Sequence, residues 1–157
     1  MADHEYFLKL CINHARKSND PSTRVGALIV SPRNGIISYG FNCFPIGIAE
    51  TDERLNDREV KLSLTVHAEM NAILFAAKKG ISTKNCTLYL IAKDARGPNI
   101  WGGPPCFRCV TEIIQTGITE IVSVIERKIP SRWAEDLILA EMVLKEAGVR
   151  FTEISFA

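Results

Sequence analysis

Two short segments of the chain combine residue types that can hold a metal ion and move a proton. The first is His67-Ala68-Glu69, and the second is Pro104-Pro105-Cys106-Phe107-Arg108-Cys109. Thiolate and imidazole groups are ligands that zinc prefers in tetrahedral sites. His67, Cys106 and Cys109 would leave a fourth position for water, which is the arrangement of a catalytic zinc. Glu69 could then take and deliver protons without binding the metal.

The elements expected around these segments place both at the start of a helix. Cys106 and Cys109 are three residues apart at the start of a predicted helix over residues 106–116, so both sulfur atoms share one face. The positive end of that helix favours thiolate over thiol. His67 begins a predicted helix over residues 67–79. If both helix starts point to the same end of a sheet, the three ligands meet around one metal.

Other interpretations of the cysteine pair stay open. A Cys-x-x-Cys pair alone is also typical of a redox centre or of half a structural zinc site. A redox centre would leave His67 and Glu69 without a role. A closed structural site needs a fourth ligand, and the remaining candidates are His4, His14, Cys11, Cys43 and Cys86. Core packing suits most of these side chains better.

The whole chain predicts a single α/β domain over residues 1–157, with three layers (α/β/α) around a five-stranded mixed sheet. Besides the two helices above, the apolar spacing predicts helices over 3–17 and 133–147, and strands over 25–30, 36–41, 85–92, 118–125 and 149–154. Strands separated by helices imply parallel pairing and right-handed crossovers. The first two strands instead form a hairpin, and the last strand is expected at an edge.

Two further segments are expected to be loops. Residues 45–63 carry many charges and little to bury, which indicates a solvated loop or a loop near the mouth of the site that touches substrate or a neighbouring subunit. Residues 93–103 are rich in glycine and lie directly before the second segment of the site.

Composition limits the class of protein and of partner. The chain is 46% hydrophobic and 24% charged, as in soluble globular proteins. A net charge of +1 favours a small-molecule substrate over a long nucleic acid. The N-terminus has no signal-peptide pattern and no stretch approaches the ~20 apolar residues of a membrane span, so a cytoplasmic protein is expected. The odd number of cysteines, five, suits a reducing compartment.

The residues of the site also carry a resemblance. His-x-Glu followed by Pro-Cys-x-x-Cys is the signature of zinc deaminases that act on nucleobases. The chain resembles the deoxycytidylate deaminase branch of the cytidine and deoxycytidylate deaminase superfamily over nearly its whole length. The other similar segments are SNDPSTRVGA at 18–27, GFNCFPIG at 40–47 and HAEMNAI at 67–73.

The resemblance implies a cytidine deaminase-like fold and zinc-dependent hydrolysis of a cytosine nucleotide, most directly deoxycytidine monophosphate (dCMP) to deoxyuridine monophosphate (dUMP) with release of ammonia. By the same resemblance Asn42 would bind the sugar and the Ala68 backbone would hold the base. Ser22, Thr23 and Arg24 would lie near the phosphate. A homo-oligomer is expected, and a nucleotide effector is a further expectation. Asn42 could equally satisfy its own turn.

The chain departs from the family pattern in two places. Cys43 stands where the family usually has glycine, in the loop associated with nucleotide effectors. Residues 93–103 intervene between the third strand and Pro-Cys, with Trp101 as a stacking surface or as a packed anchor. The alternatives are therefore a deaminase of guanine, of a modified pyrimidine or of a tRNA base, or a zinc-stabilised module without catalysis.

Overall fold

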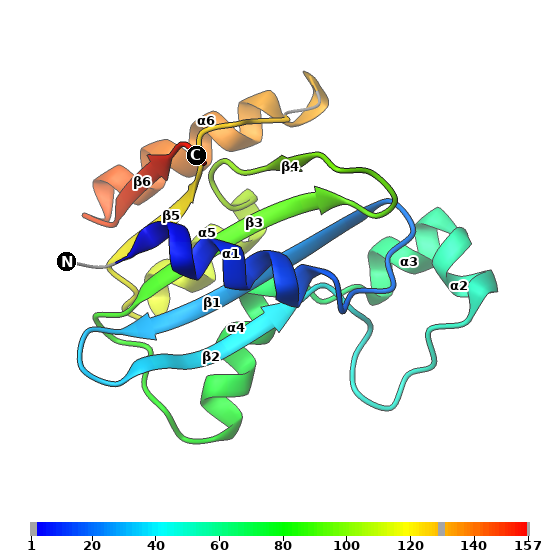
Figure 1. The fold of residues 1–157 in the computed structure, drawn as a ribbon, viewed down its shortest axis with the longest axis horizontal. Helices are drawn as coiled ribbons and strands as arrows, with labels where there is room; N and C mark the ends of the chain where they lie inside the picture. Colours follow the sequence, from blue (N-terminus) through cyan, green and yellow to red (C-terminus); the bar gives the residue numbers. More distant parts are fainter. Residues whose placement is uncertain (1–2, 129–130, 157) are drawn as a thin grey trace.

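The structure is a computed structural model that describes residues 3–128 and 131–156, in which helices and strands are interspersed along the chain (Figure 1). The helices are α1 (His4–Ala15), α2 (Asp52–Asn56), α3 (Arg58–Leu64), α4 (Ala68–Lys78), α5 (Phe107–Gln115) and α6 (Ala134–Glu146), the last preceded by a 3-10 turn, Ser131–Trp133. The strands are β1 (Thr23–Ser31), β2 (Gly35–Phe41), β3 (Thr87–Asp94), β4 (Ile100–Trp101), β5 (Glu120–Val124) and β6 (Arg150–Ile154).

One mixed sheet runs through the molecule in the order β2-β1-β3-β5-β6, with β4 added beside β3. β1 pairs antiparallel with β2 and β3, whereas β3, β5 and β6 are parallel to one another. The predicted mixed sheet, the first hairpin and the edge position of the last strand are confirmed. The two-residue β4 is a sixth strand that the sequence analysis did not predict.

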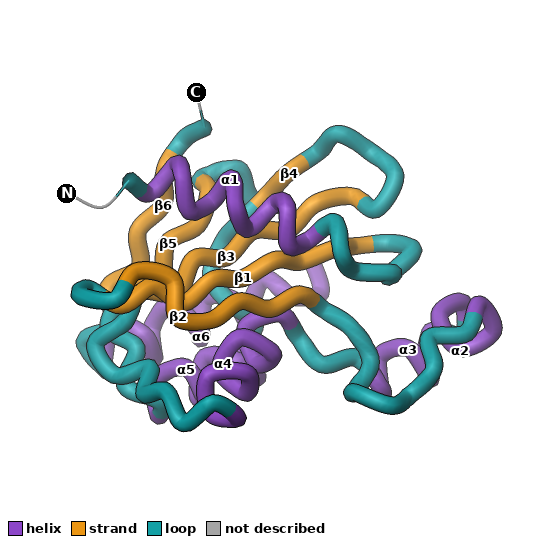
Figure 2. The backbone as a smooth tube through the Cα atoms, turned by 60° about the horizontal axis from the view of Figure 1, so that its bottom comes forward, coloured by secondary structure: helices purple, strands orange, loops and turns teal. Residues whose placement is uncertain are grey.

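The strands carry apolar side chains on both faces of the sheet, and helices cover both faces. One face packs Leu28, Tyr89 and Val122 against α1. The opposite face packs Ile29, Leu88 and other residues against α4, α5 and α6. Figure 2 shows α1 alone on one side of the strands and the other three helices together on the other side. The predicted three-layer α/β/α architecture is therefore confirmed.

Residues 45–63 are not irregular as predicted, because they contain α2 and α3. The Thr51 hydroxyl accepts a hydrogen bond from the Arg54 N–H at 3.3 Å, and the Asp57 carboxylate accepts one from the Val60 N–H at 3.2 Å. These N-caps start both helices. The expectation of little to bury holds, since neither helix contains a buried residue. Figure 1 shows the pair at one end of the molecule, beyond the ends of β1 and β2.

The predicted loop over 93–103 is largely a β-hairpin. Ala92 faces Trp101 and Lys93 faces Ile100 across the β3–β4 pair. At its turn, the Asn99 side chain donates to the Asp94 carboxylate at 2.8 Å. Glycines and a proline hid this short pairing in the sequence, because they give no alternating apolar pattern. Among the described residues, no helix has the length and apolar content that crossing a bilayer requires.

Gly40 on β2 lets the start of α4 lie directly against the sheet. A Cβ atom at this position would overlap the Ala68 carbonyl oxygen and lie 2.6 Å from the Ala72 nitrogen. Both atoms belong to a helix backbone, which cannot move aside as a flexible side chain can. Gly40 thereby allows the position of Ala68, the residue that follows the predicted metal ligand His67.

We expect Gly40→Ala to lower the free energy of unfolding by about 3 kcal/mol or more, because the added methyl group displaces α4. Urea unfolding of the zinc-loaded protein would measure the change. Gly97→Ala is the matched control: its Cβ would meet no backbone atom but only the Asp94 side chain, with Oδ2 at 2.9 Å and Cβ at 3.2 Å, so a loss of about 0.5 kcal/mol or less is expected. Equal losses in the two variants would contradict this role of Gly40.

Candidate metal centre and active site

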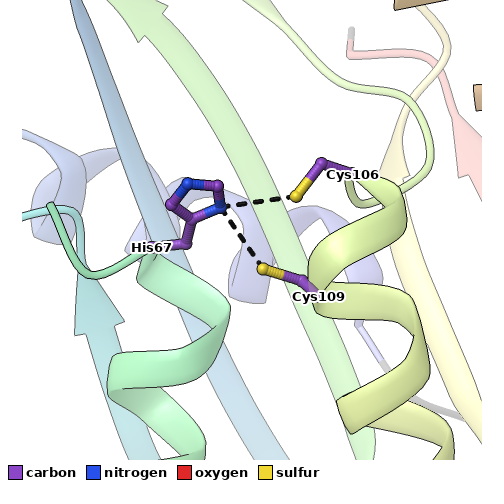
Figure 3. A group of neighbouring side chains, drawn as sticks. All are labelled: His67, Cys106 and Cys109. Carbon is purple, nitrogen blue, oxygen red and sulfur yellow. Dashed lines mark hydrogen bonds between the residues drawn. The ribbon is translucent and has the colours of Figure 1, made fainter. Parts of the chain in front are cut away.

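The three predicted metal ligands meet at the adjacent starts of α4 and α5. His67 Nδ1 lies 3.4 Å from the Cys106 sulfur and 3.3 Å from the Cys109 sulfur (Figure 3). His67 is the N-cap residue of α4 and Cys106 that of α5, and neither side chain caps its own helix. Both are therefore free to point into the gap between the two helices.

The donor set fits zinc in number and in chemistry. One ligand atom from each of His67, Cys106 and Cys109 lies within 4.8 Å of the others. No further His, Cys, Asp or Glu of the described chain joins this group. Three soft or borderline donors with an open fourth position match a catalytic rather than a closed structural site. This geometry disfavours the structural alternative.

The surroundings of Cys106 favour its thiolate form. A hydrogen bond from the Cys109 thiol, together with the hydrogen bond and positive charge of His67, lowers the pKa of Cys106 to about 4. The pKa of Cys109 is raised by that same hydrogen bond and by burial. Since a divalent cation favours the deprotonated form of its ligands, zinc would bring both sulfurs to thiolates.

Glu69 lies in the first turn of α4 with 5% of its surface exposed. Burial is the main cause that raises the pKa of Glu69 to about 7, and the negative charge of Cys106 adds to it. A carboxyl group with a pKa near neutrality can both accept and return a proton at working pH. The burial and the pKa of Glu69 thus fit the predicted role of an acid–base group.

A cavity of about 430 Å³ opens over these residues, and its lining includes His67, Glu69 and Cys106. Val25, Leu90 and Ala92 contribute an apolar floor from β1 and β3. The size lies within the range of pockets that bind small molecules. The cavity therefore has room for a small molecule beside the His67, Cys106 and Cys109 group and the buried carboxyl group.

Comparison with known protein families agrees with this site. Residues 1–125 match the cytidine and deoxycytidylate deaminase zinc-binding region. The chain belongs to the cytidine and deoxycytidylate deaminase family. The family predicted from His67, Glu69 and the Cys106–Cys109 pair is thereby confirmed.

Individual relatives of the family align over most of the chain. Deoxycytidylate deaminase of Mus musculus is 32% identical and aligns with 96% of this chain and 79% of its own length. An uncharacterized deaminase of Aliivibrio fischeri is 36% identical over 86% of this chain and 82% of its own length. The crystal structure of a cyanophage S-TIM5 dCMP deaminase in complex with dCMP and dUMP is similar to this structure, with a TM-score of 0.72 at 22% sequence identity. The match covers 98% of this chain and 99% of the cyanophage chain, which confirms the deaminase fold.

Most of the residues expected to contact substrate in this deaminase line the cavity. They are Ser22, Thr23, Asn42, Ala68 and Trp101. Arg24 does not line it. Because strand residues alternate between faces, Thr23 and Val25 face the cavity and Arg24 lies on the opposite side of β1. Its Nε donates to the Asp20 carbonyl oxygen at 3.3 Å.

The side chain of Asn42 ties the end of β2 to β1. Its oxygen accepts from the Val25 N–H at 2.8 Å, and its nitrogen donates to the Thr23 carbonyl oxygen at 2.9 Å. The local hydrogen-bonding role considered as an alternative is thus present. A carboxamide has further hydrogen-bonding capacity, so one N–H and one oxygen lone pair remain for a ligand.

Several charged residues of the cavity were missed in the sequence analysis. They are Asp20, Arg58, Lys61, Lys128 and Arg132. Asp20 follows Asn19 in a turn, a signal that could have drawn attention to it. Arg58 and Lys61 belong to α3, which lies in the segment that was expected to be a loop. No local pattern marks the two cations that follow β5.

Proposed function

We propose that this protein is a zinc-dependent deaminase that hydrolyses dCMP to dUMP and ammonia. The observation that carries this proposal is the cavity in which buried Glu69 lies beside the His67, Cys106 and Cys109 group. The cationic side chains of the lining suit a phosphorylated substrate. The relatives named deoxycytidylate deaminase support the choice of base and of phosphate.

His67, Cys106 and Cys109 would hold zinc, which would supply a water molecule whose pKa is lowered towards neutrality. Glu69 accepts the proton that the attacking water loses at the amine-bearing carbon of cytosine. It then delivers protons to the ring nitrogen and to the departing amine, so that a carbon–oxygen bond replaces the carbon–nitrogen bond. The apolar floor excludes bulk water, and the Ala68 backbone and Asn42 orient base and sugar.

A homo-oligomer is part of the same proposal. The outer side of α6 exposes three large apolar side chains, Ile138, Leu139 and Met142. Apolar surface of this kind is typical of a contact between subunits. The nucleotide effector and the cytoplasmic location stay predictions.

Ammonia release by the purified, zinc-loaded protein tests the proposed reaction. The substrates would be dCMP, deoxycytidine, cytosine, guanine and a tRNA anticodon stem-loop. We expect dCMP to have the highest kcat/KM. Deamination of guanine or of the tRNA base, with no deamination of dCMP, would show that dCMP is not the substrate. No turnover by fully zinc-loaded protein would favour the zinc-stabilised module.

A further inference from the structure

The segment that leads from β4 to Cys106 has little conformational freedom. Gly103 has a φ of +121°, in a region that residues with a side chain rarely adopt. Pro104 and Pro105 are buried, and their rings fix φ at about −65°. Only these two prolines separate Gly103 from Cys106. The backbone position of Gly103 therefore constrains that of the metal ligand.

This segment enters the sheet where two strands separate. The parallel pairing of β3 with β5 ends at Tyr89 and Val122. Beyond this point the N–H of Gly102 donates to the Glu126 carbonyl oxygen at 2.7 Å, in the segment that follows β5. On its other side, β4 pairs with β3. The end of the stretch 93–103, which departs from the family pattern, thus lies between β3 and the end of β5.

The side chain of Ser123, on β5, lies at this point and is fully buried. Its hydroxyl donates to the Leu90 carbonyl oxygen of β3 at 2.7 Å and accepts from the Gly103 N–H at 3.3 Å. A Cβ atom on Gly102 would overlap the same hydroxyl oxygen and lie 2.6 Å from the Val124 carbonyl oxygen, so the segment packs directly on β5. One buried hydroxyl thus ties the backbone before the metal ligand to two strands.

Loss of this hydroxyl would leave the Gly103 N–H without a partner. No other acceptor in the described part of the chain meets this N–H. A buried donor without a hydrogen bond is costly, so the segment would shift to find another acceptor or water. Cys106 would then occupy several positions in the metal-free protein. Because metal binding would have to order the segment again, the affinity for the metal would fall.

We propose that Ser123 is a positioning residue for the metal site: its hydroxyl holds the Gly102–Gly103 backbone and thereby places Cys106 before the metal binds. Ser123 does not line the cavity, so it acts only through this segment. The inference rests on the proposed zinc site and does not depend on which base or nucleotide is the substrate. It gives the end of the stretch 93–103 a role in metal binding.

Titration of the metal-free protein with Co²⁺ tests the inference, because thiolate-to-cobalt charge-transfer absorption reports binding at the cysteines. For Ser123→Ala we expect the affinities for Co²⁺ and for Zn²⁺ to fall about 10- to 100-fold, the range for residues that support a metal ligand. Competition with a chromophoric chelator would measure the zinc value. The ligand-field bands of bound Co²⁺ should also change shape, since Cys106 would no longer be held in place for a tetrahedral site.

Thr83→Val is the control for loss of a buried hydroxyl. The Thr83 hydroxyl donates to the Thr116 carbonyl oxygen at 3.2 Å, at the end of α5 away from Cys106. This variant should have a lower melting temperature and the metal affinity of the wild type.

Gly103→Ala is a second variant of the segment and decides the question if Ser123→Ala does not fold. Its Cβ would meet no atom closer than 3.8 Å, so the substitution acts through the positive φ. Gly148→Ala is its control, because Gly148 also has a positive φ, +73°, but follows α6. We expect only Gly103→Ala to weaken metal binding.

Two results would overturn the inference while the zinc site stands. One is a Ser123→Ala protein with a lower melting temperature but the metal affinity and cobalt spectrum of the wild type. The other is an equal loss of affinity in Thr83→Val, which would show a general effect of stability. A wild-type protein that bound neither ion would refute the proposed zinc site, and the inference with it. A wild type that bound both but deaminated no nucleotide would refute the proposed reaction alone.

Discussion

Replacement of Glu69 by glutamine is expected to reduce deamination by about 10²- to 10⁴-fold, the contribution of a general acid–base group. Glutamine has nearly the same shape but can neither accept the proton of the attacking water nor return it to the leaving amine. Since Glu69 is buried at the start of α4 and lies outside the ligand group, the zinc site should persist. Ammonia release and zinc content measured on the same preparation give both quantities.

Glu146→Gln serves as the control, because this glutamate is exposed at the end of α6 and does not line the cavity. Its activity should equal that of the wild type. Normal deamination by a zinc-loaded Glu69→Gln protein would show that another group moves the proton. Loss of zinc along with activity would show instead that Glu69 supports the metal site.

Replacement of Cys109 by serine is expected to remove the metal and with it all measurable deamination. Cys109 is fully buried and is one of the three predicted ligands that meet in the described part of the chain. A serine hydroxyl is a weak zinc ligand at neutral pH, and two protein ligands do not hold the ion at micromolar concentrations. The melting temperature should fall as well, because metal binding stabilises the folded state alone.

Cys86→Ser is the matched control. Cys86 is also buried, with 2% of its surface exposed, but it belongs to the core and not to the ligand group. Its replacement should lower stability and leave the zinc content unchanged, as measured by inductively coupled plasma mass spectrometry. A zinc content in Cys109→Ser equal to that of the control would rule out Cys109 as a ligand.

The parts of the molecule that follow from local patterns could be predicted from the sequence. Short apolar segments, of which only the last alternates with polar residues, predicted the five longer strands, and helical apolar spacing predicted four of the helices. The site could be predicted because its residue types are rare in combination and begin two helices. His67 and Cys106 meet as expected, although they are 39 positions apart in the chain.

The rest of the molecule depends on contacts between distant residues. The helices α2 and α3 have N-caps but are only five and seven residues long and contain no buried residue, so apolar periodicity could not reveal them. The register of β1 decides on which face of the sheet Arg24 lies, and a shift of the register by one residue would move Arg24 to the other face. Lys128 reaches the cavity only because β5 ends beside the β3–β4 hairpin, which no local pattern indicates.

The exposed pair of short helices, α2 and α3, has a thermodynamic consequence. Helices of five and seven residues are not stable alone in water, so contacts with the body of the protein must keep them folded. The Lys61–Asp20 pair is one such contact, and Thr65 and Leu62 border the cavity. A ligand that adds contacts there favours the folded helices, and reciprocally their folding strengthens its binding. Substrate affinity and local folding of this segment are thus linked equilibria.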